Sequence, residues 1–275
     1  MKTSIATVSL PGKLGEKLDN IAAAGFDGVE IFENDLLDSR ASAADAGRMA
    51  RDAGLAVTLF QPFRDFEGMP EPQRSRAFDL AERKFDVMEQ LGTRLILVCS
   101  NVSPLSLGSP ERAAADLHEL GERAARRGLL VGYEALSWGR HVNDHRDAWR
   151  IVQRAAHPAV GLILDTFHTL ARGIDPASIR AIPGERIFAI QVADAPKVDA
   201  DFQTWSRRLR TVPGEGELAI GDFLDAADAT GYDGHYGLEI FNEQMGERTG
   251  RAIAADGRRS LLAALEGVAR RKAAR

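Results

Sequence analysis

LGEKLDNIAAAGFDGVEIF, residues 14–32, contains the unit from which the fold is predicted. Its first eleven residues have the apolar spacing of an amphipathic helix, Gly25 ends that helix, and GVEIF at 28–32 is a short apolar strand. The same succession of helix, glycine and strand recurs at four further glycines, which are Gly54, Gly92, Gly128 and Gly231. Such alternation is typical of a parallel sheet with right-handed crossovers.

Eight apolar runs are expected as strands, each followed by a helix. The strands are Ser4–Leu10, Gly28–Phe32, Leu55–Gln61, Arg94–Ser100, Leu129–Glu134, Val160–Asp165, Ile187–Val192 and Tyr236–Phe241. The helices are Leu14–Ala24, Ala43–Ala53, Pro72–Leu91, Pro110–Arg127, Asp144–Ala155, Asp175–Ala181, Ile220–Thr230 and Arg251–Arg270.

No change of composition divides the 275 residues, so we predict one domain over 1–275, closed as a (β/α)8 TIM barrel. After the last helix we expect a short basic tail containing Arg270, Arg271, Lys272 and Arg275. The alternative fold, an open doubly wound sheet, would need a glycine-rich phosphate loop after an early strand. LPGK at 10–13 is not such a loop.

The composition excludes several classes of protein. A net charge of -5 gives no support to a nucleic-acid partner. No apolar run is long enough to span a membrane, and the first ten residues lack the apolar stretch of a signal peptide. Cys99 is the only cysteine, which excludes an internal disulfide. We therefore expect a cytoplasmic protein without a membrane partner, and the sequence leaves a homo-oligomer open.

Polar residues end the last four expected strands, where a barrel carries its active site. They are Glu134, Asp165, Gln191 and Glu239. Pointing inward together, three carboxylates and a carboxamide would repel one another and desolvate poorly without a cation. These hard oxygen donors suit Mg2+ or Mn2+, with Co2+ as a further option, and do not suit a structural zinc site. Separate hydrogen bonds at each strand end are the alternative.

Alternation along these strands predicts which residues lie beneath the polar ones inside the barrel. They are Gly132, Ile163, Ala189 and Gly237. Three of these four are small, so we expect room near the barrel axis.

Candidate acid–base and substrate groups follow the strands. His168 lies three residues after Asp165, titrates near neutrality, and is a candidate base for a carbon acid made acidic by the metal. A helix-start histidine bonded to the backbone is the alternative. Arg64 follows the third strand, and its guanidinium suits a carboxylate, unless it is simply a solvated charge.

The stretch 194–217 is long for a loop between a strand and a helix. We expect it to contain a short helix that places Ser206 and Arg210 on one face. Asn101 and Ser100 end the fourth strand and are candidates for contact with a hydroxylated substrate. The sequence does not decide between substrate contact and loop packing for Trp138, His141 and Trp205.

These residues resemble the xylose-isomerase-like barrels of sugar isomerases and epimerases, whose metal is held at the ends of the last four strands. Within that superfamily the sequence is most similar to the bacterial 3-dehydroshikimate dehydratases, from Ile5 to about Asn242. The most specific segments are QPFRDFEG at 61–68, WGRHVN at 138–143 and DTFHTL at 165–170.

The resemblance implies dehydration of 3-dehydroshikimate to protocatechuate, a step in quinate and shikimate catabolism, through a metal-stabilised enolate. It implies one divalent metal held by Glu134, Asp165, Gln191 and Glu239. It also implies that His168 is the base and that Arg64, Ser206 and Arg210 contact the substrate. Which arginine anchors the substrate carboxylate stays open. Many bacterial relatives carry a dioxygenase-like domain after the barrel, which we do not expect here because the sequence ends at Arg275.

An isomerase or epimerase of a small keto-sugar or hydroxy-keto acid is the main alternative function, because it would use the same metal and enolate chemistry. A DNA-repair endonuclease with a similar barrel would need a histidine-rich multi-zinc cluster and a basic face, and the chain has six histidines and a net charge of -5. A non-catalytic barrel would have no need of a base beside a complete set of metal ligands.

Overall fold

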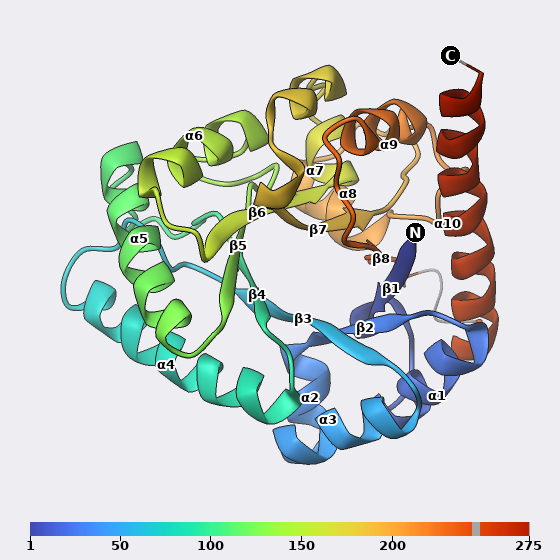
Figure 1. Ribbon diagram of the computed structural model, residues 1–275, viewed down its shortest axis with the longest axis horizontal. Coiled ribbons are helices and arrows are strands. Elements are labelled where there is room, and N and C mark those ends of the chain that lie inside the picture. Colours follow the sequence, from blue (N-terminus) through green and yellow to red (C-terminus); the bar gives the residue numbers. More distant parts are fainter. Residues whose placement is uncertain (244–247, 275) are drawn as a thin grey trace.

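The computed structural model describes residues 1–243 and 248–274, and within them eight parallel strands close into a barrel in chain order, with β8 pairing with β1 (Figure 1). The strands are β1 (Lys2–Ala6), β2 (Gly28–Phe32), β3 (Ala56–Phe63), β4 (Leu95–Cys99), β5 (Leu130–Glu134), β6 (Val160–Asp165), β7 (Ile187–Val192) and β8 (His235–Leu238). The predicted fold class is confirmed.

Helices surround the barrel (Figure 1). The α-helices are α1 (Leu14–Ala24), α2 (Glu33–Ser39), α3 (Ala43–Asp52), α4 (Gln73–Leu91), α5 (Pro110–Arg126), α6 (His145–Ala155), α7 (Thr166–Leu170), α8 (Phe202–Arg208), α9 (Ile220–Asp228) and α10 (Gly250–Ala273). Short 3-10 helices lie at η1 (Thr7–Ser9), η2 (Pro176–Ala181) and η3 (Gly184–Arg186). None of the helices described here has the length and apolar character needed to cross a membrane.

The first repeated unit shows why the sequence folds in this way. Leu14, Leu18 and Ile21 lie on one side of α1 and are buried. Gly25 follows the helix with a φ of 84°, a left-handed conformation that costs glycine little, and its N–H donates to the carbonyl of Ala22. The chain can therefore turn directly from α1 into β2.

Some predicted boundaries are wrong. β1 ends at Ala6 rather than Leu10, because the chain turns into η1, where the Thr7 hydroxyl accepts a hydrogen bond from the N–H of Phe32 at 3.0 Å. β8 ends at Leu238 rather than Phe241, so Glu239 lies one residue beyond the strand.

The predicted helices also need correction. The predicted helix 175–181 is the 3-10 helix η2, and α2 and α7 were not predicted. α7 begins where the side chain of Asp165 accepts a hydrogen bond from the N–H of His168 at 3.0 Å. The prediction of a basic tail after the last helix is wrong in part, because α10 continues through Arg270, Arg271 and Lys272 to Ala273. Arg275 lies outside the described residues.

The inside of the barrel is partly apolar and partly polar. Ile163 and Ala189 pack there with Leu59 and Leu97, as the strand alternation predicts. The predicted room beneath the site is already filled. A Cβ added to Gly132 would lie 2.5 Å from Ile163 Cγ1.

Candidate active site

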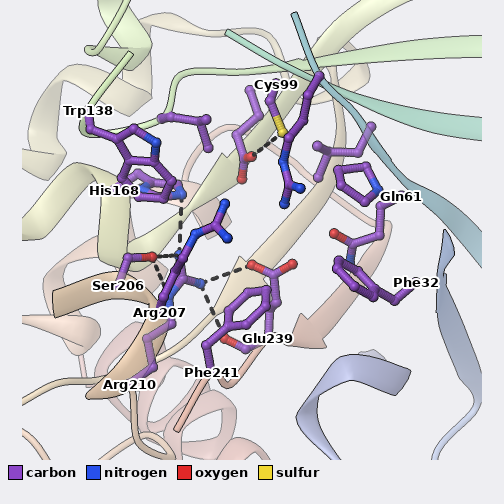
Figure 2. Close-up of a pocket in the computed structure, with 15 residues that line it drawn as sticks. Phe32, Gln61, Cys99, Trp138, His168, Ser206, Arg207, Arg210, Glu239 and Phe241 are labelled. Atoms are coloured by element: carbon purple, nitrogen blue, oxygen red, sulfur yellow. Dashed lines mark hydrogen bonds and ion pairs between the residues drawn. The ribbon is translucent and has the colours of Figure 1, made fainter. Parts of the chain in front are cut away.

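A small pocket opens at the carboxyl ends of the strands, with a cavity volume of about 30 Å³ (Figure 2). Its lining unites many of the residues that the sequence analysis selected. The residues that line it are Phe32, Gln61, Pro62, Arg64, Leu97, Cys99, Glu134, Leu136, Trp138, His168, Ser206, Arg207, Arg210, Glu239 and Phe241.

The candidate metal ligands are buried at this end of the barrel. Glu134 and Asp165 are the last residues of β5 and β6, and Gln191 is the last but one of β7. Glu134, Asp165 and His168 each offer a ligand atom within 4.8 Å of the other two. Burial raises the pKa of Glu134 well above its usual range, and repulsion by Asp165 and Glu239 raises it further. The site thus holds several carboxyl groups close together where water does not screen them, and burial disfavours their ionisation.

Two oxygen atoms of this set lack a partner. Glu134 Oε1 and Gln191 Oε1 are buried without a hydrogen bond among the described residues. An unsatisfied buried polar atom costs about 1–3 kcal/mol, so a native structure needs a reason to keep one. Both are hard oxygen donors, and a divalent cation is the partner that such donors bind. The residues present therefore fit a divalent metal.

Arg210 lies within this acidic group and is 1% exposed. Its guanidinium donates to Asp165 Oδ2 at 2.8 Å and to Glu239 Oε2 at 3.0 Å. Figure 2 shows the same group reaching Ser206, whose hydroxyl oxygen accepts a hydrogen bond at 2.8 Å. Burial alone would raise the pKa of Asp165, but the adjacent Arg210 brings it below its ordinary value. Asp165 is therefore ionised and paired with Arg210.

The predicted short helix in 194–217 is confirmed as α8. α8 ends at Arg208, so Arg210 lies two residues beyond it. The predicted proximity of Ser206 to Arg210 nevertheless holds, because the chain after α8 returns the guanidinium to the Ser206 hydroxyl.

His168 projects from α7 into the same pocket and is buried. Burial, helped by the positive charge of Arg210, lowers the pKa of His168 to about 3. Nε2 lies 3.2 Å from a nitrogen of Arg210, and Nδ1 lies 3.1 Å from the Ser137 hydroxyl. The imidazole is consequently neutral at neutral pH, which is the state that can accept a proton.

Two further guanidinium groups line the pocket. Arg64 lies on the loop after β3, and Arg207 on α8 lies over the ring of Trp138 at 6.0 Å from its centroid. Neither has a hydrogen bond or ion pair within residues 1–243 and 248–274. Burial lowers the pKa of Arg207, and repulsion by Arg64 lowers it further. The pocket therefore presents two guanidinium groups without a hydrogen-bonded partner in the described chain, an arrangement suited to an anion.

Four candidates for substrate contact lie elsewhere, and one of them, Ser100, accepts a hydrogen bond from the N–H of Leu136 at 3.0 Å. The side chain of Asn101 donates to the carbonyl of Glu67 and accepts a hydrogen bond from the N–H of Ser103, so it holds the loop and does not line the pocket. His141 lies 3.0 Å from the carbonyl of Ser106 and lines other cavities. Trp205 donates to the carbonyl of Pro196 at 2.9 Å. Trp138, by contrast, lines the pocket.

The sequence analysis missed two functional candidates, Glu30 and Arg207. Glu30 is the one charged residue in the apolar strand GVEIF, and that exception was the available signal. Its buried carboxyl accepts hydrogen bonds from Gln61 and Gln191, and burial raises its pKa to about 8. Arg207 gave no distinct signal, because Arg208 and Arg210 lie beside it in the sequence.

A closed barrel with acidic and amide oxygens at the carboxyl ends of its strands defines a class of proteins. The family model described as xylose isomerase-like TIM barrel matches residues 18–264, and the chain belongs to that family.

Two curated proteins and one solved structure are identical to this chain at more than half of the aligned residues. A 3-dehydroshikimate dehydratase of Pseudomonas putida is 55% identical over 262 residues, which are 95% of this chain and 41% of that protein. A 3-dehydroshikimate dehydratase of Pseudomonas aeruginosa is 54% identical over 262 residues, which are 95% of this chain and 41% of that protein. The chain thus spans about two fifths of the length of these curated relatives. A solved xylose isomerase-like TIM barrel/4-hydroxyphenylpyruvate dioxygenase fusion protein superposes with a TM-score of 0.95 at 54% identity, over 98% of this chain and 43% of the fusion.

Proposed function

We propose that this chain dehydrates 3-dehydroshikimate to protocatechuate with the help of a divalent metal. The observation that carries the proposal is that a neutral histidine, His168, shares one pocket with buried oxygen donors and with two arginines that have no partner in the described chain. The substrate is suggested by the two relatives with the dehydratase name.

In this proposal Glu134, Asp165, Gln191 and Glu239 hold one divalent cation, Mg2+ or Mn2+, with Co2+ as a further option. A bound cation supplies Lewis-acid chemistry that makes the C–H beside a ketone more acidic. The two unpartnered oxygens, Glu134 Oε1 and Gln191 Oε1, support this assignment. Glu134 thereby belongs to both the metal site and the catalytic group.

His168 takes the proton from the carbon beside the ketone onto Nε2, the nitrogen near Arg210. The electron pair of the broken C–H bond forms a C=C bond as the β-hydroxyl leaves. His168 then returns the proton to the departing hydroxyl, so that one water is lost and a ring dienone is left. The dienone aromatises when a proton moves from the remaining ring CH2 to the ketone oxygen, which becomes the second phenol hydroxyl. The proton is easily returned, because burial and the charge of Arg210 disfavour the imidazolium.

Arg64 and Arg207 hold the ring carboxylate in this proposal, because both guanidiniums line the pocket without a partner in the described chain. Arg210 is already engaged by Asp165 and Glu239. It and Ser206 instead contact the polar groups of the ring. No substrate contact is proposed for Asn101, whose polar atoms are engaged with its own loop.

The test is to incubate the chelator-treated chain with 3-dehydroshikimate and Mg2+, Mn2+ or Co2+, and to follow the products by NMR and by aromatic absorbance. We expect protocatechuate only when metal is added. Folded protein that forms no protocatechuate with any ion would refute the dehydratase proposal. Interconversion of a keto-sugar by the same sample would favour the isomerase or epimerase alternative.

A further inference from the structure

Glu30 lies inside the barrel on β2 and is 2% exposed. Its Oε2 accepts hydrogen bonds from Gln191 Nε2 at 2.8 Å and from Gln61 Nε2 at 3.1 Å. Its Oε1 accepts one from the Ser4 hydroxyl at 3.1 Å. A single carboxyl group thus binds side chains of three other strands, which are β1, β3 and β7.

The barrel is built to let this side chain cross it. Ser4, Gly237 and Gln191 lie side by side in the strand register of β1, β8 and β7. A Cβ on Gly237 would lie 1.7 Å from Glu30 Oε1, so only glycine leaves room for the carboxyl. Because β8 has no side chain at this position, Glu30 reaches Gln191 over the intervening strands.

This contact decides which way the Gln191 amide faces. An amide nitrogen only donates hydrogen bonds and an amide oxygen only accepts them. With Nε2 bound to Glu30, the oxygen Oε1 faces away from it, buried and without a partner among the described residues. In the reversed amide the oxygen would take the place of Nε2 beside Glu30 Oε2, which already accepts the Gln61 N–H, and the N–H groups would lie where Oε1 lies now. A reversed amide could not serve as a ligand.

We propose that Glu30 is a positioning residue that fixes the Gln191 amide with its oxygen turned toward the metal. The inference rests on the metal assignment of the proposed function. Partners of this kind change metal affinity by about 10- to 100-fold when they are replaced.

The experiment is a calorimetric titration of chelator-treated protein with Mn2+, with no substrate present. Glu30→Met removes the acceptor at similar length, and we expect it to weaken Mn2+ binding by about 10- to 100-fold. Glu30→Gln keeps an acceptor oxygen for both amides and an N–H group for Ser4, so its affinity should stay close to wild type. Glu30→Asp shortens the side chain by one methylene, which moves the carboxylate away from the Gln191 amide and should weaken Mn2+ binding. This variant tests the inference if Glu30→Met does not fold.

A double-mutant cycle separates positioning from a general structural role. In the Gln191→Ala background, Glu30→Met should cause no further loss of Mn2+ affinity, because the amide on which Glu30 acts is gone. Three results would overturn the inference. The first is wild-type Mn2+ affinity in folded Glu30→Met or Glu30→Asp, and the second is a loss of affinity on Glu30→Met that is as large in the Gln191→Ala background as in wild type. The third is a Glu30→Gln variant that binds Mn2+ as weakly as Glu30→Met. Wild-type protein that binds no Mn2+ would refute the metal assignment and the inference together, whereas unchanged binding in Glu30→Met refutes the inference alone.

Discussion

Replacing Arg207 with methionine tests how the pocket recognises an anion. Arg207 and Arg64 both line the pocket, and neither forms a hydrogen bond or ion pair in the part of the chain that the structure describes. A hydrogen bond between charged groups contributes about 1.5–3 kcal/mol. Loss of one such bond to the substrate carboxylate should lower kcat/KM by about 10- to 150-fold. Most of the change should appear in KM, because the carboxylate stays bound from substrate to product.

The same substitution should not destabilise the fold. Arg207 has no hydrogen-bonded or ion-paired partner in the described chain that its loss would leave unsatisfied, and the positive charge of Arg64 opposes that of Arg207. The free energy of unfolding of Arg207→Met should therefore stay within about 0.5 kcal/mol of wild type, or rise slightly. Chemical denaturation measures it directly.

The assay is the initial rate of aromatic product against substrate concentration, for wild type, Arg207→Met and Arg64→Met. Arg208→Met is the matched control, because Arg208 lies on the same helix, faces Glu243 at 3.4 Å and does not line the pocket. We expect the control to keep the wild-type kcat/KM. An Arg207→Met protein with unchanged kcat/KM, or a control that loses as much as Arg207→Met, would refute the reasoning.

Three further predictions concern other parts of the molecule. His168→Ala should lower kcat by about 10²- to 10⁴-fold with near-normal Mn2+ binding, and full activity would exclude it as the base. Burial lowers the pKa of His145 from 6.5 to about 4. Between pH 6.5 and 4 the unfolded chain therefore binds a proton at His145 that the folded chain does not bind. The free energy of unfolding falls as pH falls through this range, by at most about 3 kcal/mol. A melting-temperature series should show this loss reduced in His145→Gln, and an identical series would contradict it. Gly47→Ala should destabilise by about 1–3 kcal/mol in urea unfolding, because its Cβ would lie 2.4 Å from the Leu91 carbonyl oxygen; wild-type stability would show that the backbone yields freely.

The sequence predicts the barrel well because the fold repeats one simple unit. Each apolar strand is short, and a glycine such as Gly25 marks the end of the helix before it. Strand ends depend on local turns that hydrophobicity does not record, so the structure ends β1 at the Thr7 turn. α2 was missed because its support is tertiary, in ion pairs of Lys17 with Asp35 and of Lys84 with Glu33.

The site is predictable only where strand geometry governs it. A residue at the end of a parallel strand must lie at the mouth of the barrel, which locates Glu134 and Asp165. Nothing comparable predicts that Glu30 reaches Gln191, because that contact depends on the space above Gly237, which lies two strands away around the barrel. Loop side chains are harder still, and Asn101 binds within its own loop rather than lining the pocket.

The most direct test of the central claim is a metal titration of activity. Chelator-treated chain is supplied with Mn2+ in steps, and the rate of protocatechuate formation from 3-dehydroshikimate is followed by absorbance at each step. We predict no product without metal, and a rate that rises with Mn2+ and saturates when one ion is bound per chain. A rate that is independent of metal, or no aromatic product at saturation in folded protein, would contradict the account.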